Sequence, residues 1–96
     1  MSIRVVARDH VKPECKEEAL KLIKEMVEIT RTEKGNISYA FNQDLNNPEF
    51  FAMIEEWESE ECLKTHMESE HFKRIIPQLG AMMAEPSRLE VYKQIV

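Results

Sequence analysis

The sequence is poor in glycine, cysteine and long apolar stretches. Its 96 residues include only two glycines and four prolines, which leaves no low-complexity segment and no flexible linker. The longest apolar run covers residues 50–54, far short of the roughly 18 residues that a membrane-spanning helix needs. We therefore expect no membrane-spanning segment. The alternating pattern that begins within a few residues of Met1 also leaves no apolar stretch for a secretory signal.

Cysteine usage and charge narrow the class of protein further. Cys15 and Cys62 occur in a chain without an export signal, so we interpret them as reduced thiols of a cytoplasmic protein. We expect both to be small apolar fillers rather than nucleophiles, because no partner base can be assigned to either. The 13 Lys and Arg residues against 18 Asp and Glu residues give a net charge of −5. This balance, without a basic cluster, argues against nucleic acid and anionic membrane surfaces as partners.

The first third of the chain predicts a strand followed by a helix. Residues 3–11 alternate apolar and polar side chains as a strand does, although Asp9 interrupts the apolar phase. After Pro13, apolar residues recur every three or four positions as far as Thr30, which predicts an amphipathic helix. Gly35 is expected to end this helix, because glycine adopts the left-handed conformation at low cost.

The rest of the chain predicts three more strands and two helices. The strands are expected at residues 37–42, 49–57 and 88–95, with a turn at residues 46–48 joining the first two into a hairpin. Ser59 and Ser69 are suitable N-caps for the two helices, and the second helix is expected to bend or restart at Pro77.

This order of elements predicts a single α+β domain over residues 1–96 with a ferredoxin-like fold. Such a fold has one four-stranded antiparallel sheet with helices on one face. A chain of this length buries only roughly 60–65% of its unfolded surface, so a core shared with a second subunit would add stability.

The third strand has apolar residues on both faces, which a strand with one solvated face would not favour. We therefore expect a ligand or a second sheet against the face without helices, and specifically a homodimer, a dimeric α+β barrel whose sheets pack face to face. Replacing Phe51 or Met53 by Asp should separate the subunits if these residues face the partner.

Glu55 and Trp57 share one strand face, which we expect to point away from the helices or to lie at their rim. A pocket and an edge salt bridge explain Glu55 equally well.

The sequence lacks the motifs of several common phosphate-binding, redox and metal sites. The sequence has no glycine-rich phosphate loop, no Cys-x-x-Cys pair and no His-Glu-x-x-His motif. His66 and His71 are five positions apart, so one continuous helix would hold them roughly 140° apart, and we expect no metal site. His10 falls in the polar phase of the first strand and is expected at the surface. His66 is either a satisfied interfacial histidine beside Leu63 and Met67 or a proton shuttle, since an unperturbed pKa of about 6.5 suits that role.

The stretch from Glu55 to Phe72 carries a recognisable pattern, and two upstream stretches, residues 31–39 and 47–51, extend it. The pattern consists of Glu55-Glu56-Trp57-Glu58-Ser59, then Leu63 and His66, then Ser69-Glu70-His71-Phe72. It resembles the signature of the antibiotic biosynthesis monooxygenase (ABM) domain family, and the similarity runs from Ile3 to about Tyr92. The resemblance implies dimers of ferredoxin-like subunits whose sheets face each other.

The resemblance implies one of several activities, because the family divides. Some members are cofactor-independent monooxygenases of phenolic polyketides or quinols, others degrade haem, and others isomerise a phosphorylated quorum-signal sugar. The haem branch fits poorly, because Ile76 stands where that branch has its iron-ligating histidine and Ala7 where it has an asparagine. The pattern is most similar to small quinol-oxidising members. This implies no cofactor, with a small aromatic substrate and dioxygen as the reacting partners.

For such an oxygenase, the resemblance and the residue types give His66 the role of catalytic base and His71 that of a supporting proton relay. Trp57, Tyr39 and Glu55 would bind the substrate and form the pocket wall. The alternative is a small-molecule-binding dimer without oxygenase activity, or the sugar isomerase. A phosphate group would then need cations, for which Lys34, Arg8 and Arg74 are the candidates.

Overall fold

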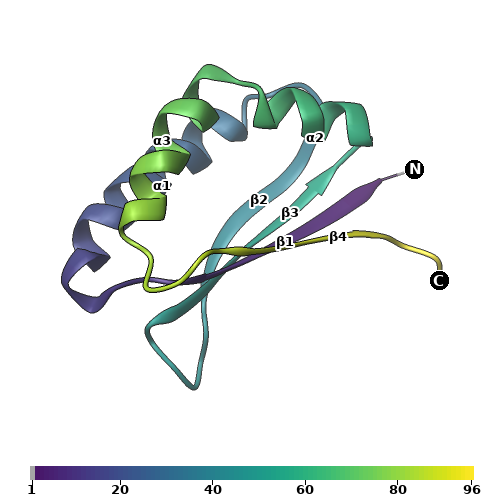
Figure 1. The fold of residues 1–96 in the computed structure, drawn as a ribbon. Coiled ribbons are helices and arrows are strands. Elements are labelled where there is room, and N and C mark those ends of the chain that lie inside the picture. Colours follow the sequence, from purple (N-terminus) through teal and green to yellow (C-terminus); the bar gives the residue numbers. More distant parts are fainter. Residues whose placement is uncertain (1) are drawn as a thin grey trace.

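Four antiparallel strands form one sheet, and three α-helices cover one of its faces (Figure 1). The computed structural model describes residues 2–96, and no helix in this range is long and apolar enough to cross a membrane. The elements are β1 (Ile3–His10), η1 (Pro13–Cys15), α1 (Lys16–Thr30), β2 (Asn36–Gln43), β3 (Phe50–Trp57), α2 (Glu60–Met67), α3 (Glu70–Ala81) and β4 (Arg88–Lys93). The ferredoxin-like α+β fold expected from the sequence is confirmed.

The sheet has the strand order β2-β3-β1-β4, so the two central strands are the first and third of the chain. In the β1–β3 ladder, Val5 lies opposite Glu55, Ala7 opposite Met53, and Asp9 opposite Phe51. Helices α1 and α3 lie side by side over the sheet, and α2 connects the end of β3 to α3 (Figure 1). The central strands are therefore covered by helices on one face only.

Both serine caps are confirmed, the expected end of the first helix at Gly35 is wrong, and the third helix does not restart at Pro77. The Ser59 hydroxyl accepts a hydrogen bond from the Cys62 amide, and the Ser69 hydroxyl accepts one from the Phe72 amide. Helix α3 does not restart at Pro77 but continues through it to Ala81. Ile75 and Leu79, on either side of this proline, are both buried, and their packing holds the helix together.

The first helix ends at Thr30, earlier than Gly35, because local hydrogen bonds close its last turn. Thr32 donates its hydroxyl to the Ile29 carbonyl at 2.7 Å, and the Arg31 amide bonds back into the helix. Gly35 instead turns the chain into β2 with a positive φ of 85°. A Cβ added there would lie 2.3 Å from Sγ of Cys62, so this turn excludes larger residues.

The face of β3 that carries Glu55 and Trp57 points toward the helices, which corrects the opposite expectation. Phe51, Met53, Glu55 and Trp57 alternate as the buried positions of the strand, and Trp57 is fully buried. The expected Asp substitutions at Phe51 or Met53 would therefore damage the core rather than test an interface. The pleat places Phe50 and Ile54 on the opposite face, where they are 36% and 47% exposed.

Candidate active site

An apolar cavity of about 240 Å³ lies between the sheet and helices α1 and α3. Its walls are mostly Met, Phe, Ile and Leu side chains, and no Lys, Arg or His within residues 2–96 lines it. The volume is below the roughly 300–1,000 Å³ of sites for drug-sized ligands, which matches a ligand of one or two rings. Four polar side chains reach the cavity: Asp9, Tyr39, Glu55 and Ser87.

Glu55 is the most unusual of these groups, because its carboxyl is buried among apolar side chains. Only 6% of the residue is exposed, and its Oε1 accepts a hydrogen bond of 2.9 Å from Nε1 of Trp57. The two side chains meet because residues two apart share one face of a strand. Burial raises the pKa of Glu55 to about 7, the Trp57 bond opposes this rise, and the nearby charge of Glu33 adds to it. Glu55 can therefore gain or lose a proton near neutral pH.

Tyr39 and Asp9 add two further titratable groups to the cavity wall. Tyr39 lies opposite Glu55 in the β2–β3 ladder, and burial raises its pKa, so its hydroxyl stays protonated at neutral pH. Asp9 accepts a hydrogen bond from the Ser87 hydroxyl, and burial outweighs that bond to raise its pKa as well. The cavity thus holds one neutral donor and two carboxyls whose charged forms are disfavoured.

His66 lies beside this cavity rather than in its wall. Together with Glu55 it lines an adjoining cavity of about 40 Å³. Its ring centroid lies 4.8 Å from that of Trp57 and 5.4 Å from that of Tyr39. Burial lowers the pKa of His66, while the hydrogen bond and charge of Glu33 oppose this effect. The imidazole is therefore neutral at pH 7.

His71 contacts the same carboxylate from a second helix. Nδ1 of His66 lies 3.0 Å from Oε1 of Glu33, and Nε2 of His71 lies 2.7 Å from the same oxygen. Thr30 Oγ1 is 3.2 Å from His71 Nε2. The side chain of Glu33 is 16% exposed, so this network joins the buried histidines to the surface.

The separation of roughly 140° expected for one continuous helix does not apply, because two helices carry the histidines. His66 belongs to α2 and His71 to α3, and the break at Ser69 turns both rings toward Glu33. The ligand atoms of the three residues lie within 4.8 Å of one another. The two N···O distances are those of hydrogen bonds, so two imidazoles sharing one carboxylate oxygen account for the arrangement.

Of the five site residues expected from the sequence, Tyr39 and Glu55 line the larger cavity and His66 lines the smaller one. Trp57 touches the site through Glu55, and His71 through Glu33. Sequence reasoning missed Glu33, Thr30, Asp9 and Ser87 as members of this region. Asp9 gave one signal, because it interrupts the apolar phase of β1.

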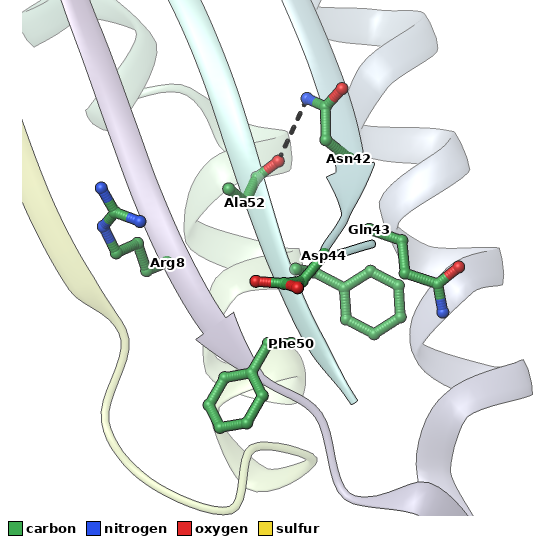
Figure 2. A pocket seen from close by; sticks show the side chains of 7 residues that line it. Arg8, Asn42, Gln43, Asp44, Phe50 and Ala52 are labelled. Carbon is green, nitrogen blue, oxygen red and sulfur yellow. Dashed lines mark hydrogen bonds between the residues drawn. The ribbon is translucent and has the colours of Figure 1, made fainter. Parts of the chain in front are cut away.

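The cations considered for phosphate binding lie outside the cavity. Arg8 lines a separate hollow of about 190 Å³ near the β2–β3 turn, together with the carboxylate of Asp44 (Figure 2). Its Nε lies 3.1 Å from a Glu90 carboxylate oxygen. Arg74 forms ion pairs of 2.8 Å with both Glu25 and Glu70, and Lys34 is exposed.

The fold and the carboxyl-bearing apolar cavity define a ferredoxin-like protein with a candidate site for a small ligand. The chain belongs to the antibiotic biosynthesis monooxygenase (ABM) family, whose model matches residues 2–78. It is similar to a conserved protein of known structure from Methanosarcina mazei Go1, with 40% identity, a TM-score of 0.98 and coverage of 99% of this chain and 94% of the other. It is also similar to a crystal structure described as an antibiotic biosynthesis monooxygenase, with 32% identity, a TM-score of 0.93 and coverage of 98% and 99%.

A curated relative, the uncharacterized protein sll1783 of Synechocystis sp. (strain ATCC 27184 / PCC 6803 / Kazusa), is 31% identical over 91 residues, which cover 95% of this chain. The chain spans 62% of the length of that relative.

Proposed function

We propose that this chain is a cofactor-independent monooxygenase that oxidises a small quinol or phenolic aromatic with dioxygen in the 240 Å³ cavity. The observation that carries the proposal is Glu55, a carboxyl with a pKa of about 7 in an apolar cavity. A general base acts best when its pKa lies near the working pH, and strongly shifted carboxyls are concentrated at functional sites. Membership of the ABM family and the similarity to a structure described as a monooxygenase support the same reaction class.

In this reaction the substrate supplies the electrons. Glu55 removes a proton from the aromatic hydroxyl, and the resulting electron-rich anion reduces dioxygen between the apolar walls of the cavity. One oxygen atom enters the ring and the other leaves as water, so a quinol and dioxygen give a hydroxyquinone and water. Tyr39 lines the same cavity and its hydroxyl stays protonated, so we assign it the hydrogen bond to the anion.

We assign the role of base to Glu55 instead of His66 because, of these two residues, only Glu55 lines the larger cavity. His66 becomes a positioning and relay residue, since it shares the 40 Å³ cavity with Glu55 and contacts Glu33 through Nδ1. A cavity of this size can hold a water molecule between Glu55 and the neutral imidazole. The proton then passes to the partly exposed Glu33, and His71 fixes that carboxylate from the other side.

Oxygen uptake under ¹⁸O₂ tests the proposal. Chelator-treated protein should accelerate the oxidation of a reduced naphthoquinone above its spontaneous rate, and the hydroxylated product should carry one heavy oxygen atom. Spontaneous oxidation gives the quinone and peroxide without incorporation, so product mass separates the two reactions. No acceleration across a panel of one- and two-ring quinols and phenols would overturn the proposal.

The sugar isomerase is the weaker candidate, because a phosphate group would meet two carboxyls and no cation in this cavity. Arg8 and Arg74, two of the candidate cations for phosphate binding, form ion pairs with carboxylates outside the cavity. Stabilisation by a phosphorylated sugar, read as a rise in melting temperature, would favour that function instead.

We further propose that two copies pair through the sheet face opposite the helices. Ile54 is 47% exposed on that face, and Asp at this position would place an unpaired charge in the interface. Ile54→Asp should convert a dimer into a folded monomer in sedimentation at micromolar concentration. A wild-type monomer, or an Ile54→Asp dimer, would contradict this arrangement. Phe51→Asp is the contrasting variant, because it should unfold the chain.

A further inference from the structure

We propose that Asp9 and Glu55 clamp the two ends of an aromatic diol, so that the site selects neutral para-dihydroxy aromatics over monophenols and anions. This inference rests on the proposed function and names its substrate class. It follows from where β1 and β3 place the two carboxyls and from the surface between them.

The ladder fixes the separation of the two residues along the strands. Val5 is the residue opposite Glu55, and Asp9 lies four positions further along the same strand. An even offset keeps both side chains on the helix-covered face, and four residues at roughly 3.3 Å each separate the two backbone positions by about 13 Å along the strands. Both line the same cavity. The two carboxyls therefore reach one ligand-sized space from strand positions about 13 Å apart.

The surface between the two ends suits an aromatic ring. The register pair midway between them is Ala7 and Met53, and both residues line the cavity. The small side chain of Ala7 leaves space above the strand, while Phe41 and Phe72 supply aromatic walls. A ring that lies over Ala7 can present one hydroxyl to each carboxyl. Two hydrogen bonds of about 2.7 Å then occupy part of the 13 Å span.

Each carboxyl has one oxygen held and one oxygen available. Ser87 donates to Oδ1 of Asp9, and Trp57 donates to Oε1 of Glu55. Within residues 2–96 the second oxygen of each group has no hydrogen-bond donor. Each of these oxygens can accept a hydrogen bond from a ligand hydroxyl, so a ligand with a hydroxyl at each end engages both. Burial raises the pKa of both groups, which makes a second negative charge in the cavity unfavourable.

The two ends have different tasks in this arrangement. Glu55 lies beside His66 and the path to Glu33, so it takes the proton of the reacting hydroxyl. Asp9 holds the other hydroxyl and thereby positions the ring, without a route of its own to the histidines. Asp9 is a specificity residue rather than the base.

Anaerobic titration of the fluorescence of Trp57, the only tryptophan, measures binding without turnover. The probes are 1,4-dihydroxynaphthalene, 4-methoxy-1-naphthol, which lacks one hydroxyl donor, and 1,4-dihydroxy-2-naphthoic acid, which adds an anion. The diol should bind roughly 10- to 100-fold more tightly than the ether and the acid. Asp9→Ala should remove most of the preference over the ether. Glu56→Ala, a carboxyl loss on the opposite face of the sheet, should leave it unchanged.

Equal binding of the diol and the ether by the wild-type protein would overturn the clamp, whatever the behaviour of the variants. An unchanged preference in folded Asp9→Ala would overturn it as well. Oxygen uptake separates this inference from the function on which it rests. Uptake with both the diol and the monophenol at equal efficiency rejects the clamp and keeps the oxygenase. Selective diol binding without any uptake rejects the oxygenase and keeps the clamp.

Discussion

Replacing Glu55 by Gln should nearly abolish quinol oxidation while making the protein more stable at neutral pH. Gln has almost the same shape and can still accept the hydrogen bond from Nε1 of Trp57, so the cavity should keep its geometry. It cannot accept the substrate proton. Loss of a positioned general base typically costs about 10²–10⁴-fold in rate, and we expect kcat for a reduced naphthoquinone to fall in that range.

The gain in stability follows from the sign of the pKa shift. Burial raises the pKa of Glu55 from 4.5 to about 7 in the folded protein, so between these values the folded state binds more protons than the unfolded state. The free energy of unfolding therefore falls as pH rises through this window, by roughly 3 kcal/mol in total. A Gln side chain does not ionise, so it makes no such pH-dependent contribution to the free energy of unfolding. In urea denaturation, Glu55→Gln should exceed the wild type by a few kcal/mol at pH 8 and by little near pH 4.5.

Glu56→Gln is the matched control, because Glu56 is the next residue on the same strand and lies on the opposite face. It pairs with Arg4 at 3.4 Å, and its loss should change neither the rate nor the pH dependence of stability by much. Protein concentration must be the same in all samples, since subunit association also contributes to stability. Wild-type turnover in Glu55→Gln would remove Glu55 as the base, and equal stability at both pH values would show that its carboxyl is not buried as described.

Much of the fold could be predicted because its signals are local. The alternation in β1, the spacing of apolar residues in α1 and the serine caps each depend on a few neighbouring residues. Which face of β3 meets the helices could not be read in the same way. Phe50 to Ile54 are apolar on both faces, so the strand alone does not distinguish a core face from an exposed one. Pairing with β1 and the position of α3 decide it.

The candidate site was harder to predict because its residues meet only in three dimensions. His66 and His71 belong to the sequence motif and were predicted to act as a base and a relay. In the structure they contact Glu33 instead of lining the larger cavity. Glu55 was expected only to bind substrate. Its unusual proton affinity comes from burial, which depends on how α1 and α3 pack over the sheet. A carboxylate in the sequence carries no sign of that environment.

His66→Ala should lower both stability and turnover, and added imidazole should restore much of the turnover. The ring is almost fully buried against Trp57, Tyr39 and Phe72, so its removal leaves a cavity and takes one donor from Glu33. We expect the free energy of unfolding to fall by about 2–4 kcal/mol. The rate should fall roughly 10- to 100-fold, at the low end of what proton transfer contributes, because water in the enlarged space replaces part of the relay.

Leu63→Ala separates the relay from the packing. Leu63 lies on the same helix and lines the same 40 Å³ cavity, so its truncation also opens space next to Glu55 but removes no proton carrier. It should destabilise the protein to a similar extent, leave the rate within about twofold to threefold of the wild type, and show no response to imidazole. If both variants lose the same activity, or if imidazole rescues neither, His66 serves only the packing around Trp57. Rescue confined to His66→Ala requires that the imidazole ring itself carries the proton away from Glu55.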